Sequence, residues 1–310
     1  MESLNRMALE LADEALDFAE ELDVGAFELD NGATVLDFGV EHTGGVEAGL
    51  LLAELQTAGL ATVQTRVGEV GNGTVPYVES STDHPGLALL GAQKAGWELA
   101  VGGFEGLASG PARALVADEA EYRALDYVDA FEFAVLTVEA ETLPTAAVAE
   151  RVAERAGVSP EQTYLVVAPS ASVAGSVAAA SRAAEAAVFR LFELDYDPQA
   201  VVSATASAPV PPVAEDEGAA IARAKDAVAY GGRVHLVVEE DSETFGEVPS
   251  SAAETHGEPF AAVFDDAGWD FGEVDPAAFG PATLTVDVLG GPTDTYGALE
   301  RGLVAQSFGL

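Results

Sequence analysis

Strand-like and helix-like segments alternate along the whole of this 310-residue chain. Short runs rich in β-branched and aromatic residues, such as residues 131–140 and 164–169, predict strands. Segments with apolar residues three to four positions apart, such as residues 145–157, predict helices between them. Because no long run of one type occurs, the pattern predicts a mixed α/β (α+β) protein of two or more layers.

The same patterns extend over the rest of the chain. Further strands are expected at residues 33–40, 60–70, 75–82, 97–103, 201–206, 231–240 and 282–291. Further helices are expected at residues 3–22, 44–56, 82–97, 171–193, 215–230 and 258–268. The length suits two α/β domains, expected at residues 1–160 and 161–310, with the chain free to cross between them. GPARALV (110–116) resembles GPATLTV (280–286), which leaves a duplicated fold as an alternative to chance.

Acidity is the unusual feature of the composition. The chain carries 53 acidic residues against 13 basic ones, a net charge of −40, and the acids are spread over its whole length. Such a surface is typical of proteins from cells that hold molar KCl, where screening removes most of the self-repulsion. Nucleic acid is excluded as a partner, because there is no basic stripe to neutralise phosphates. The absence of Cys excludes disulfides, thiolate nucleophiles and cysteine-based metal sites.

Residues 162–181 form a segment of twenty residues without a formal charge. Its length is marginal for a membrane span, but its Ser, Gly, Pro and Ala content is wrong for one. Small residues instead suggest close packing, or backbone that a ligand approaches. No membrane association is therefore expected, and residues 1–16 are acidic and amphipathic rather than typical of a secretory signal.

Arg182 and Glu185 follow this uncharged segment directly. On a helix they would share one face with Phe189 and Phe192, partly out of bulk water. One interpretation is a surface ion pair worth a few tenths of a kcal/mol. The other is a functional pair, in which partial burial and a guanidinium oppose each other and keep a carboxylate suitable as a general base. The order of the residues favours the second, since Glu before Arg is the better order for a helical surface pair.

Other candidates have simpler alternatives. His84 could be a base, although a residue at a helix start is the more common role. Residues 215–217 are three consecutive acids that could bind a metal, but acids in a first helical turn also complement the helix dipole. The glycine pairs Gly44–Gly45 and 231–232 could let backbone approach a ligand, yet they match no nucleotide-binding fingerprint. The four His residues show no metal-ligand spacing, so no metal site is predicted.

Seven long segments together resemble one known family over nearly the whole chain. They are GVEHTGGVEAGLLLAELQTAGLATV (39–63), STDHPGLALLGAQKAGW (81–97), SGPARAL (109–115), YLVVAPSASVAGSVAAASRAAE (164–185), ATASAPVPPVAEDEG (204–218), AYGGRVHL (229–236) and SFGL (307–310). The sequence resembles the methenyltetrahydromethanopterin cyclohydrolases, as a salt-adapted, haloarchaeal member. This resemblance implies a cytoplasmic homotrimer of two α/β domains with a substrate cleft between them, and neither a cofactor nor a metal.

The resemblance also implies an activity and its residues. The reaction is the reversible hydrolysis of the 5,10-methenyl group of a reduced pterin to a formyl group, with Arg182 and Glu185 as the catalytic pair. Substrate contacts are expected from two sets of residues: the bases Lys94, Arg113, Arg223 and Arg233 for the anionic tail, and Gly44, Gly45, Ser170 and Ser172 where backbone lies close. The carrier could be tetrahydromethanopterin or a tetrahydrofolate. Two alternatives remain, a non-catalytic pterin-binding protein of the same fold and an enzyme for another small anionic substrate.

Overall fold

The structure is a computed structural model that describes residues 3–310, and the chain forms two compact units. The first unit holds the described chain up to Ala61 together with Leu87–Ala178, and the second holds Thr62–Gly86 and Ala179–Leu310. This division differs from the one expected at residue 160. The reason is β8 (Thr163–Ala168), which pairs in parallel with β2 (Thr34–Asp37) and β7 (Ala134–Glu139) in the middle of the first sheet.

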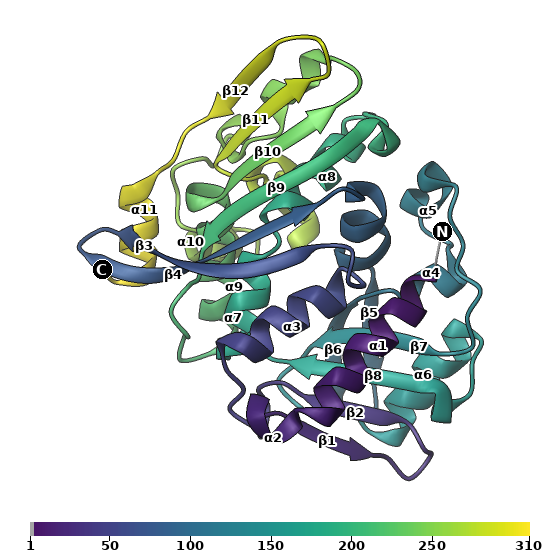
Figure 1. Ribbon diagram of the computed structural model, residues 1–310. Helices are drawn as coiled ribbons and strands as arrows, with labels where there is room; N and C mark the ends of the chain where they lie inside the picture. The colour runs from purple at the N-terminus through teal and green to yellow at the C-terminus, as the bar shows by residue number, and fades with distance from the viewer. Residues whose placement is uncertain (1–2) are drawn as a thin grey trace. The chain divides into compact units, whose positions relative to one another are not determined.

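The first unit is built around a mixed sheet whose strands lie in the order β1-β2-β8-β7-β6-β5 (Figure 1). The three central strands β2, β8 and β7 are parallel, and the outer neighbours are antiparallel. The outer strands are β1 (Gly25–Glu28), β5 (Trp97–Val101) and β6 (Phe104–Ser109). β8 is almost wholly buried along its length, as expected for a parallel strand covered on both faces.

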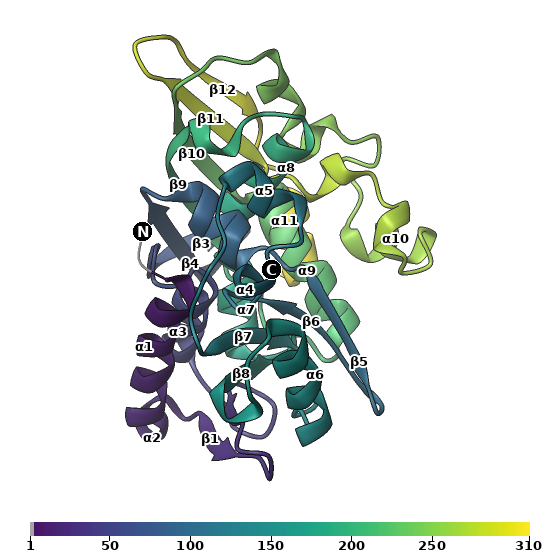
Figure 2. The ribbon, with the colours of Figure 1, turned by 90° about the vertical axis from the view of Figure 1, so that its right-hand side faces the viewer.

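Two hydrophobic clusters cover the two faces of this sheet. Helices α1 (Leu4–Asp17) and α3 (Val46–Gln56) pack on the face that carries Val135 and Val166. Helix α6 (Ala146–Ala156) packs on the face that carries Leu136 and Val167 (Figure 2). Because neighbouring residues of a strand point to opposite faces, the unbroken apolar runs of β7 and β8 supply both clusters. The first unit therefore has a helix–sheet–helix layering.

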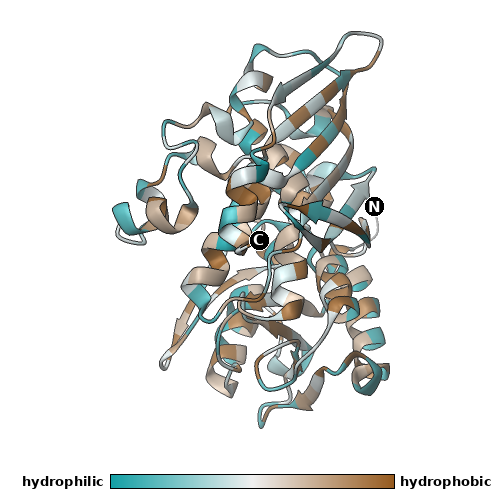
Figure 3. Ribbon diagram, turned by 90° about the vertical axis from the view of Figure 1, so that its left-hand side faces the viewer, coloured by the Kyte–Doolittle hydropathy of each residue, from teal (hydrophilic) through white to brown (hydrophobic). Residues whose placement is uncertain are grey.

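The second unit is built around a sheet with the strand order β12-β11-β10-β9-β4-β3. Only β10 (Arg233–Val238) and β11 (Thr283–Val288) are parallel neighbours among its described strands. The other strands are β3 (Thr62–Val70), β4 (Gly73–Thr82), β9 (Val201–Pro209) and β12 (Thr293–Gly297). Burial alternates along β11, and Figure 3 shows brown and teal segments following each other along the strands of this sheet. One face is therefore apolar and the other polar.

Helices cover the apolar face of the second sheet. α8 (Ala183–Glu193) and α9 (Glu217–Gly231) pack against β9. An aromatic-rich cluster joins α9 to α10 (Phe260–Asp266) and α11 (Arg301–Phe308). The remaining helices are α2 (Ala19–Leu22), α4 (Arg113–Val116), α5 (Ala120–Leu125), α7 (Val173–Ala180), a π-helix (Gly86–Gln93) and short 3₁₀ turns at Pro160–Gln162, Pro198–Ala200, Glu243–Glu247, Ser250–Ala252, Phe271–Glu273 and Pro276–Phe279. None of the helices among residues 3–310 has the length and apolar content needed to cross a membrane.

The structure confirms the expected α/β class and corrects several elements. The helix expected at 171–193 is two helices, α7 and α8, with a break at Ser181–Arg182. The helix expected at 82–97 is a π-helix that begins only at Gly86. The two similar heptapeptides adopt different structures, because residues 113–116 form α4 while residues 283–286 lie in β11. Their similarity therefore does not mark equivalent positions of a duplicated fold.

Asp226 of α9 connects three helices of the second unit. Its carboxylate accepts a hydrogen bond from the Phe260 backbone N–H at 2.9 Å and from Ser307 Oγ at 2.6 Å. The side chain is buried, and this burial raises the pKa of Asp226 to about 6, although both hydrogen bonds oppose the shift. Ionised Asp226 thus holds α10 and α11 to α9 at a cost in desolvation.

Replacing Asp226 with Asn is expected to change the pH dependence of stability. Because the folded-state pKa lies above the unfolded value, the folded protein binds the proton more tightly. Protonation of Asp226 therefore stabilises the folded protein at acid pH. This stabilisation is lost as the pH rises through about 6, where the folded protein releases the proton. The free energy of unfolding of Asp226→Asn, minus that of wild type, should rise by ~1 kcal/mol between pH 5 and pH 7. Urea titrations in molar KCl measure this free energy at each pH, and Asp266→Asn, at an exposed position, is the control. Stability–pH profiles that run parallel for Asp226→Asn and wild type would contradict the prediction.

Candidate active site

Arg182 and Glu185 lie together at the start of α8. Arg182 occupies the N-cap position, and Glu185 is the acidic residue of the first turn. Arg182 Nη1 lies 3.5 Å from Glu185 Oε2, and the two side chains are 19% and 13% exposed. The pair is therefore mostly buried but still in contact with solvent. A site that uses water as a reactant needs both properties.

The helix start explains the reversed order of the pair. The N-terminus of a helix favours negative charge, so Glu185 is stabilised there by the helix dipole. Arg182 precedes the helix and adds a fixed positive charge beside it. Phe189 and Phe192 are half-buried like the pair, while Ala184, Val188 and Leu191 are buried. The face predicted from the sequence for Arg182, Glu185, Phe189 and Phe192 is confirmed, although it belongs to α8 rather than to one long helix.

A second group of polar residues lies in the first unit, where the parallel strands β2, β7 and β8 end. Asp37, the last residue of β2, is buried and accepts hydrogen bonds from four successive backbone N–H groups, those of residues 39–42. The ring of His42 also lies 3.1 Å from Asp37 Oδ2. Burial alone would raise the pKa of Asp37, but these hydrogen bonds lower it below its usual range. An ionised Asp37 therefore fixes the loop that leads to Gly44 and Gly45.

Ser170, Ser172 and the glycine pair gather at this edge of the first sheet. Ser170 Oγ donates a hydrogen bond to Glu139 at the end of β7. Ser172 Oγ donates to the Pro169 carbonyl at 2.8 Å and accepts from the Gly175 N–H at 2.9 Å. A Cβ added to Gly44 would lie 3.8 Å from the Cβ of Ala174. Since ligands of open α/β sheets bind at the carboxyl ends of parallel strands, the position suits a substrate-binding edge.

The small residues of segment 170–181 mainly serve the protein's own packing. A Cβ added to Gly175 would lie 2.1 Å from the Pro169 carbonyl oxygen. A Cβ added to Gly49 of α3 would lie 2.6 Å from the Cβ of Val177 in α7. The sequence predicts that other groups lie close to the backbone of this segment. In the structure, these groups belong to α3 and to the loop after β8.

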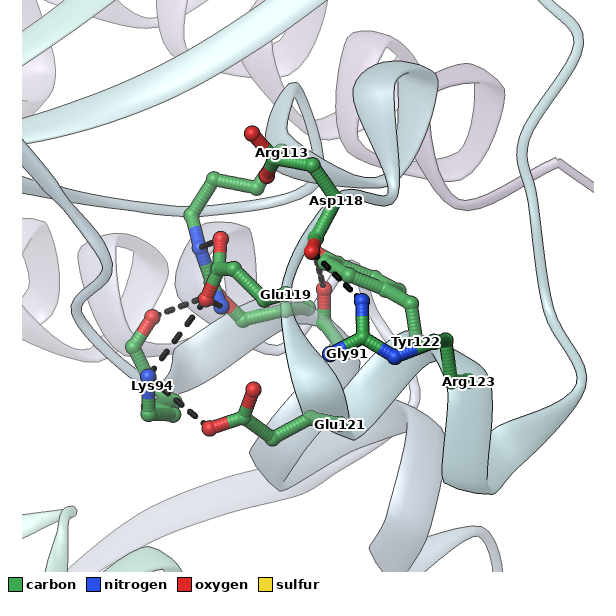
Figure 4. A network of polar contacts seen from close by, with 9 residues as sticks. Gly91, Lys94, Arg113, Asp118, Glu119, Glu121, Tyr122 and Arg123 are labelled. Atoms are coloured by element: carbon green, nitrogen blue, oxygen red, sulfur yellow. Dashed lines mark hydrogen bonds and ion pairs between the residues drawn. The ribbon is translucent and has the colours of Figure 1, made fainter.

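Lys94 and Arg113 belong to a buried ion network of the first unit (Figure 4). Arg113 donates from Nε and Nη2 to the two carboxylate oxygens of Glu119, at 3.0 and 2.5 Å, and from Nη1 to the Lys94 carbonyl. Lys94 Nζ lies 3.4 Å from Glu119 and 3.0 Å from Glu121. Burial by itself would raise the pKa of Glu119, but the two cations lower it.

The position of Arg113 argues against the substrate contact expected from the sequence. Its side chain is 0% exposed, and Glu119 already accepts its bidentate fork. Arg113 therefore stabilises the first unit. Arg223 is half-buried, with a weak hydrogen bond of 3.4 Å to the Pro212 carbonyl, and so keeps donors for a ligand. Arg233 begins β10 and lines a cavity of the second unit.

The simpler interpretations hold for the other candidates. Asp216 is the N-cap of α9 and accepts from the Ala219 N–H at 2.8 Å, as expected for acids at a helix start. His84 is exposed, and its N–H donates to Thr82 Oγ1. Among residues 3–310, no group of three or more His, Asp or Glu side chains is arranged as metal ligands. No local sequence pattern points to Asp37 or Glu139, because only the pairing of β2, β8 and β7 brings them beside the glycine and serine residues.

The chain is a two-unit α/β protein whose part-buried Arg–Glu pair is a candidate for acid–base chemistry. The family model of the cyclohydrolases (MCH) matches residues 3–308. The methenyltetrahydromethanopterin cyclohydrolase of Halobacterium salinarum is 64% identical over the full length of both chains. Those of Methanoregula boonei and Methanoculleus marisnigri are 38% and 37% identical, again over the full length of both chains. The chain therefore belongs to the methenyltetrahydromethanopterin cyclohydrolase family, a family of hydrolases.

Proposed function

We propose that this enzyme hydrolyses the 5,10-methenyl group of tetrahydromethanopterin, reversibly, to the formyl form, and so acts in one-carbon metabolism. The 3.5 Å Arg182–Glu185 pair at the part-buried start of α8 is the observation that carries the proposal. Full-length relatives with this named activity support the choice of substrate. The match to Halobacterium salinarum and the net charge of −40 support function at high salt.

The chemistry needs few groups from the protein. The methenyl carbon lies between two nitrogens of an amidinium cation, so it is already electrophilic. A water attacks this carbon while Glu185 accepts one of its protons, which gives a neutral tetrahedral adduct. One C–N bond then breaks, Glu185 returns its proton to the freed nitrogen, and the adduct's hydroxyl proton leaves to solvent. One water is consumed and one proton is released.

The side chains have separate roles in this mechanism. Arg182 places a fixed positive charge beside Glu185 and orients it toward the attacking water. Gly44, Gly45, Ser170 and Ser172 form the edge of the first unit that would contact the substrate. Arg223 is the proposed contact for its anionic tail, because Lys94 is already paired with Glu119 and Glu121. A homotrimer in the cytoplasm, and no cofactor, complete the proposal, and sedimentation of the purified chain in molar KCl measures the oligomeric state.

An absorbance assay of ring opening tests the function directly. Wild-type protein in molar KCl is expected to accelerate loss of the methenyl chromophore of methenyltetrahydromethanopterin. The same assay with methenyltetrahydrofolate shows which carrier the enzyme prefers. A higher kcat/KM for the folate would contradict tetrahydromethanopterin as the proposed carrier. Binding of the pterin without any acceleration over the uncatalysed rate would overturn the enzymatic proposal in favour of a pterin-binding protein.

A further inference from the structure

The second unit contains a cavity of about 220 Å³ with an unusual concentration of positive charge. It lies where β3, β4 and the first residue of β10 meet the end of α9 and the start of α11. Its lining residues include Arg66, Arg233 and Arg301 together with Tyr77 and Tyr230. Glu69, an exposed residue of β3, also lines it. Neither Arg182 nor Glu185 is among the lining residues.

This concentration stands out against the rest of the chain. Only 13 of the 310 residues are Lys or Arg, against 53 acids, so each base has many carboxylates available. Several bases elsewhere are paired with acids, for example Arg151 with Glu154 and Arg190 with Glu193. Within residues 3–310, the side chains of Arg233 and Arg301 have no ion-pair, hydrogen-bond or ring partner. Two unpaired arginines that line one cavity point to a ligand of negative charge.

The sheet fixes the position of the arginines. Arg66 Nε lies 2.5 Å from Glu79 Oε1, and its guanidinium stacks 4.5 Å from the centre of the Tyr77 ring. Its Nη2 also reaches Ser207 Oγ at 3.4 Å, and Ser207 is the register partner of Arg233. Arg66 and Arg233 therefore lie on the same face of the sheet, on either side of Ser207. Arg301 is the first residue of α11.

The two tyrosines line the cavity but do not supply hydrogen-bond donors to a ligand. Tyr77 Oη donates to the Glu69 carbonyl at 3.1 Å, and Tyr230 Oη donates to the Glu258 carbonyl at 2.5 Å. Their hydroxyl protons are therefore engaged within the protein, and the hydrogen-bond donors that remain for a ligand are those of the guanidinium groups. Guanidinium groups bind phosphate and similar oxyanions through parallel pairs of N–H donors. The volume corresponds to roughly seven waters, which is enough for a phosphate with a short attached chain.

We propose that this cavity binds a phosphate-type oxyanion through Arg66, Arg233 and Arg301. The group enters either as a free anion or as the charged end of the substrate. Arg233 and Arg301 supply the unpaired forks, and Arg66 supplies further positive charge from its place over Tyr77. The negative charge of Glu69, which also lines the cavity, opposes binding, so the site favours groups of high negative charge.

Titration with inorganic phosphate tests the site without any turnover, so its outcome does not depend on the proposed reaction. Calorimetry at constant ionic strength compares wild type with Arg233→Gln, Arg301→Gln and the control Arg151→Gln, which removes an exposed arginine outside the cavity. Wild type is expected to bind one phosphate per chain. Each cavity variant should weaken binding roughly tenfold or more, while the control binds like wild type. Absence of saturable binding by wild type, or equal weakening in Arg151→Gln, would overturn the proposal.

Steady-state kinetics of the same variants identify the source of the anion. If the anion is the end of the substrate, both cavity variants should raise KM with kcat unchanged, and phosphate should compete with the substrate. If it is a separate anion, KM should stay at the wild-type value while phosphate binding is still lost. Both outcomes support the site, and thermal unfolding of each variant confirms that it is folded.

Discussion

Glu185→Gln is expected to lower kcat for ring opening by roughly 10² to 10⁴-fold. The amide has nearly the shape of the carboxylate but cannot accept the proton of the attacking water. The N-terminal position in α8 tolerates Gln, so the fold should be retained. KM should change little, because the lost interaction belongs to the transition state. Loss of the methenyl absorbance in molar KCl, followed with wild type and variant, measures the effect.

The same helix supplies a matched control. Arg190 and Glu193 form another pair three residues apart in α8, at 3.3 Å, near the opposite end of the helix. Glu193→Gln removes the same charge from a similar local pair and should leave kcat within about twofold of wild type, because Glu193 lies at the other end of α8 and takes no part in the proposed proton transfer. Turnover by Glu185→Gln close to that of Glu193→Gln would show that Glu185 is not the base. Arg182→Gln should also lower kcat, because the carboxylate would lose its orienting cation.

Arg113→Met is expected to destabilise the protein by about 3–5 kcal/mol. The substitution keeps the apolar length of the side chain but leaves the carboxylate of Glu119 part-buried without the guanidinium that holds it. Lys94 remains nearby at 3.4 Å, yet it also neutralises Glu121. Urea unfolding in molar KCl measures the loss, followed by a signal of the first unit, because the two units need not unfold together.

A double variant separates the ion pair from the packing around it. Arg113→Met with Glu119→Leu removes both charges and should recover most of the stability, because a buried pair is often no better than apolar residues of similar volume. The exposed pair Arg151–Glu154 provides the control, and Arg151→Gln should stay within about 0.5 kcal/mol of wild type. A loss of less than 1 kcal/mol in Arg113→Met would contradict the stabilising role of this network.

The sequence predicts most elements of both units and misses three short strands. β7 and β8 are apolar throughout, and α6 has clear helical periodicity and ends at Gly157, which adopts the left-handed conformation with φ of 75°. β1 and β12 are short strands at the sheet edges, and β6 is a short strand between β7 and β5; none has strong alternation, so no local pattern reveals them. No Gly or Pro marks the end of α7 at Ala180, so the Ala-rich segment reads as one helix.

The candidate site was predictable only in part, because local patterns do not reveal contacts between residues that are distant in sequence. Arg182 and Glu185 are close in sequence and follow an uncharged segment, so they could be chosen from the sequence. Arg113 could be identified as a base, but only the folded chain places Glu119 against its guanidinium. Arg66, Arg233 and Arg301 are more than sixty residues apart from one another and meet because β3, β10 and α11 meet. Long-range contacts of this kind leave no pattern in a local segment.

The interleaved composition of the two units has a consequence for how this chain folds. Within the described chain, β4 pairs with β9, and Tyr77 lies opposite Pro209. Well over a hundred residues, among them most of the first unit, separate these neighbours. During synthesis, the edge of β4 that pairs with β9 therefore stays unpaired until β9 leaves the ribosome. Such long-range pairing slows folding and exposes an edge to association with other chains. Neither the segment before residue 179 nor the segment after it carries a complete sheet for the second unit, so separately expressed halves should aggregate unless they are produced together.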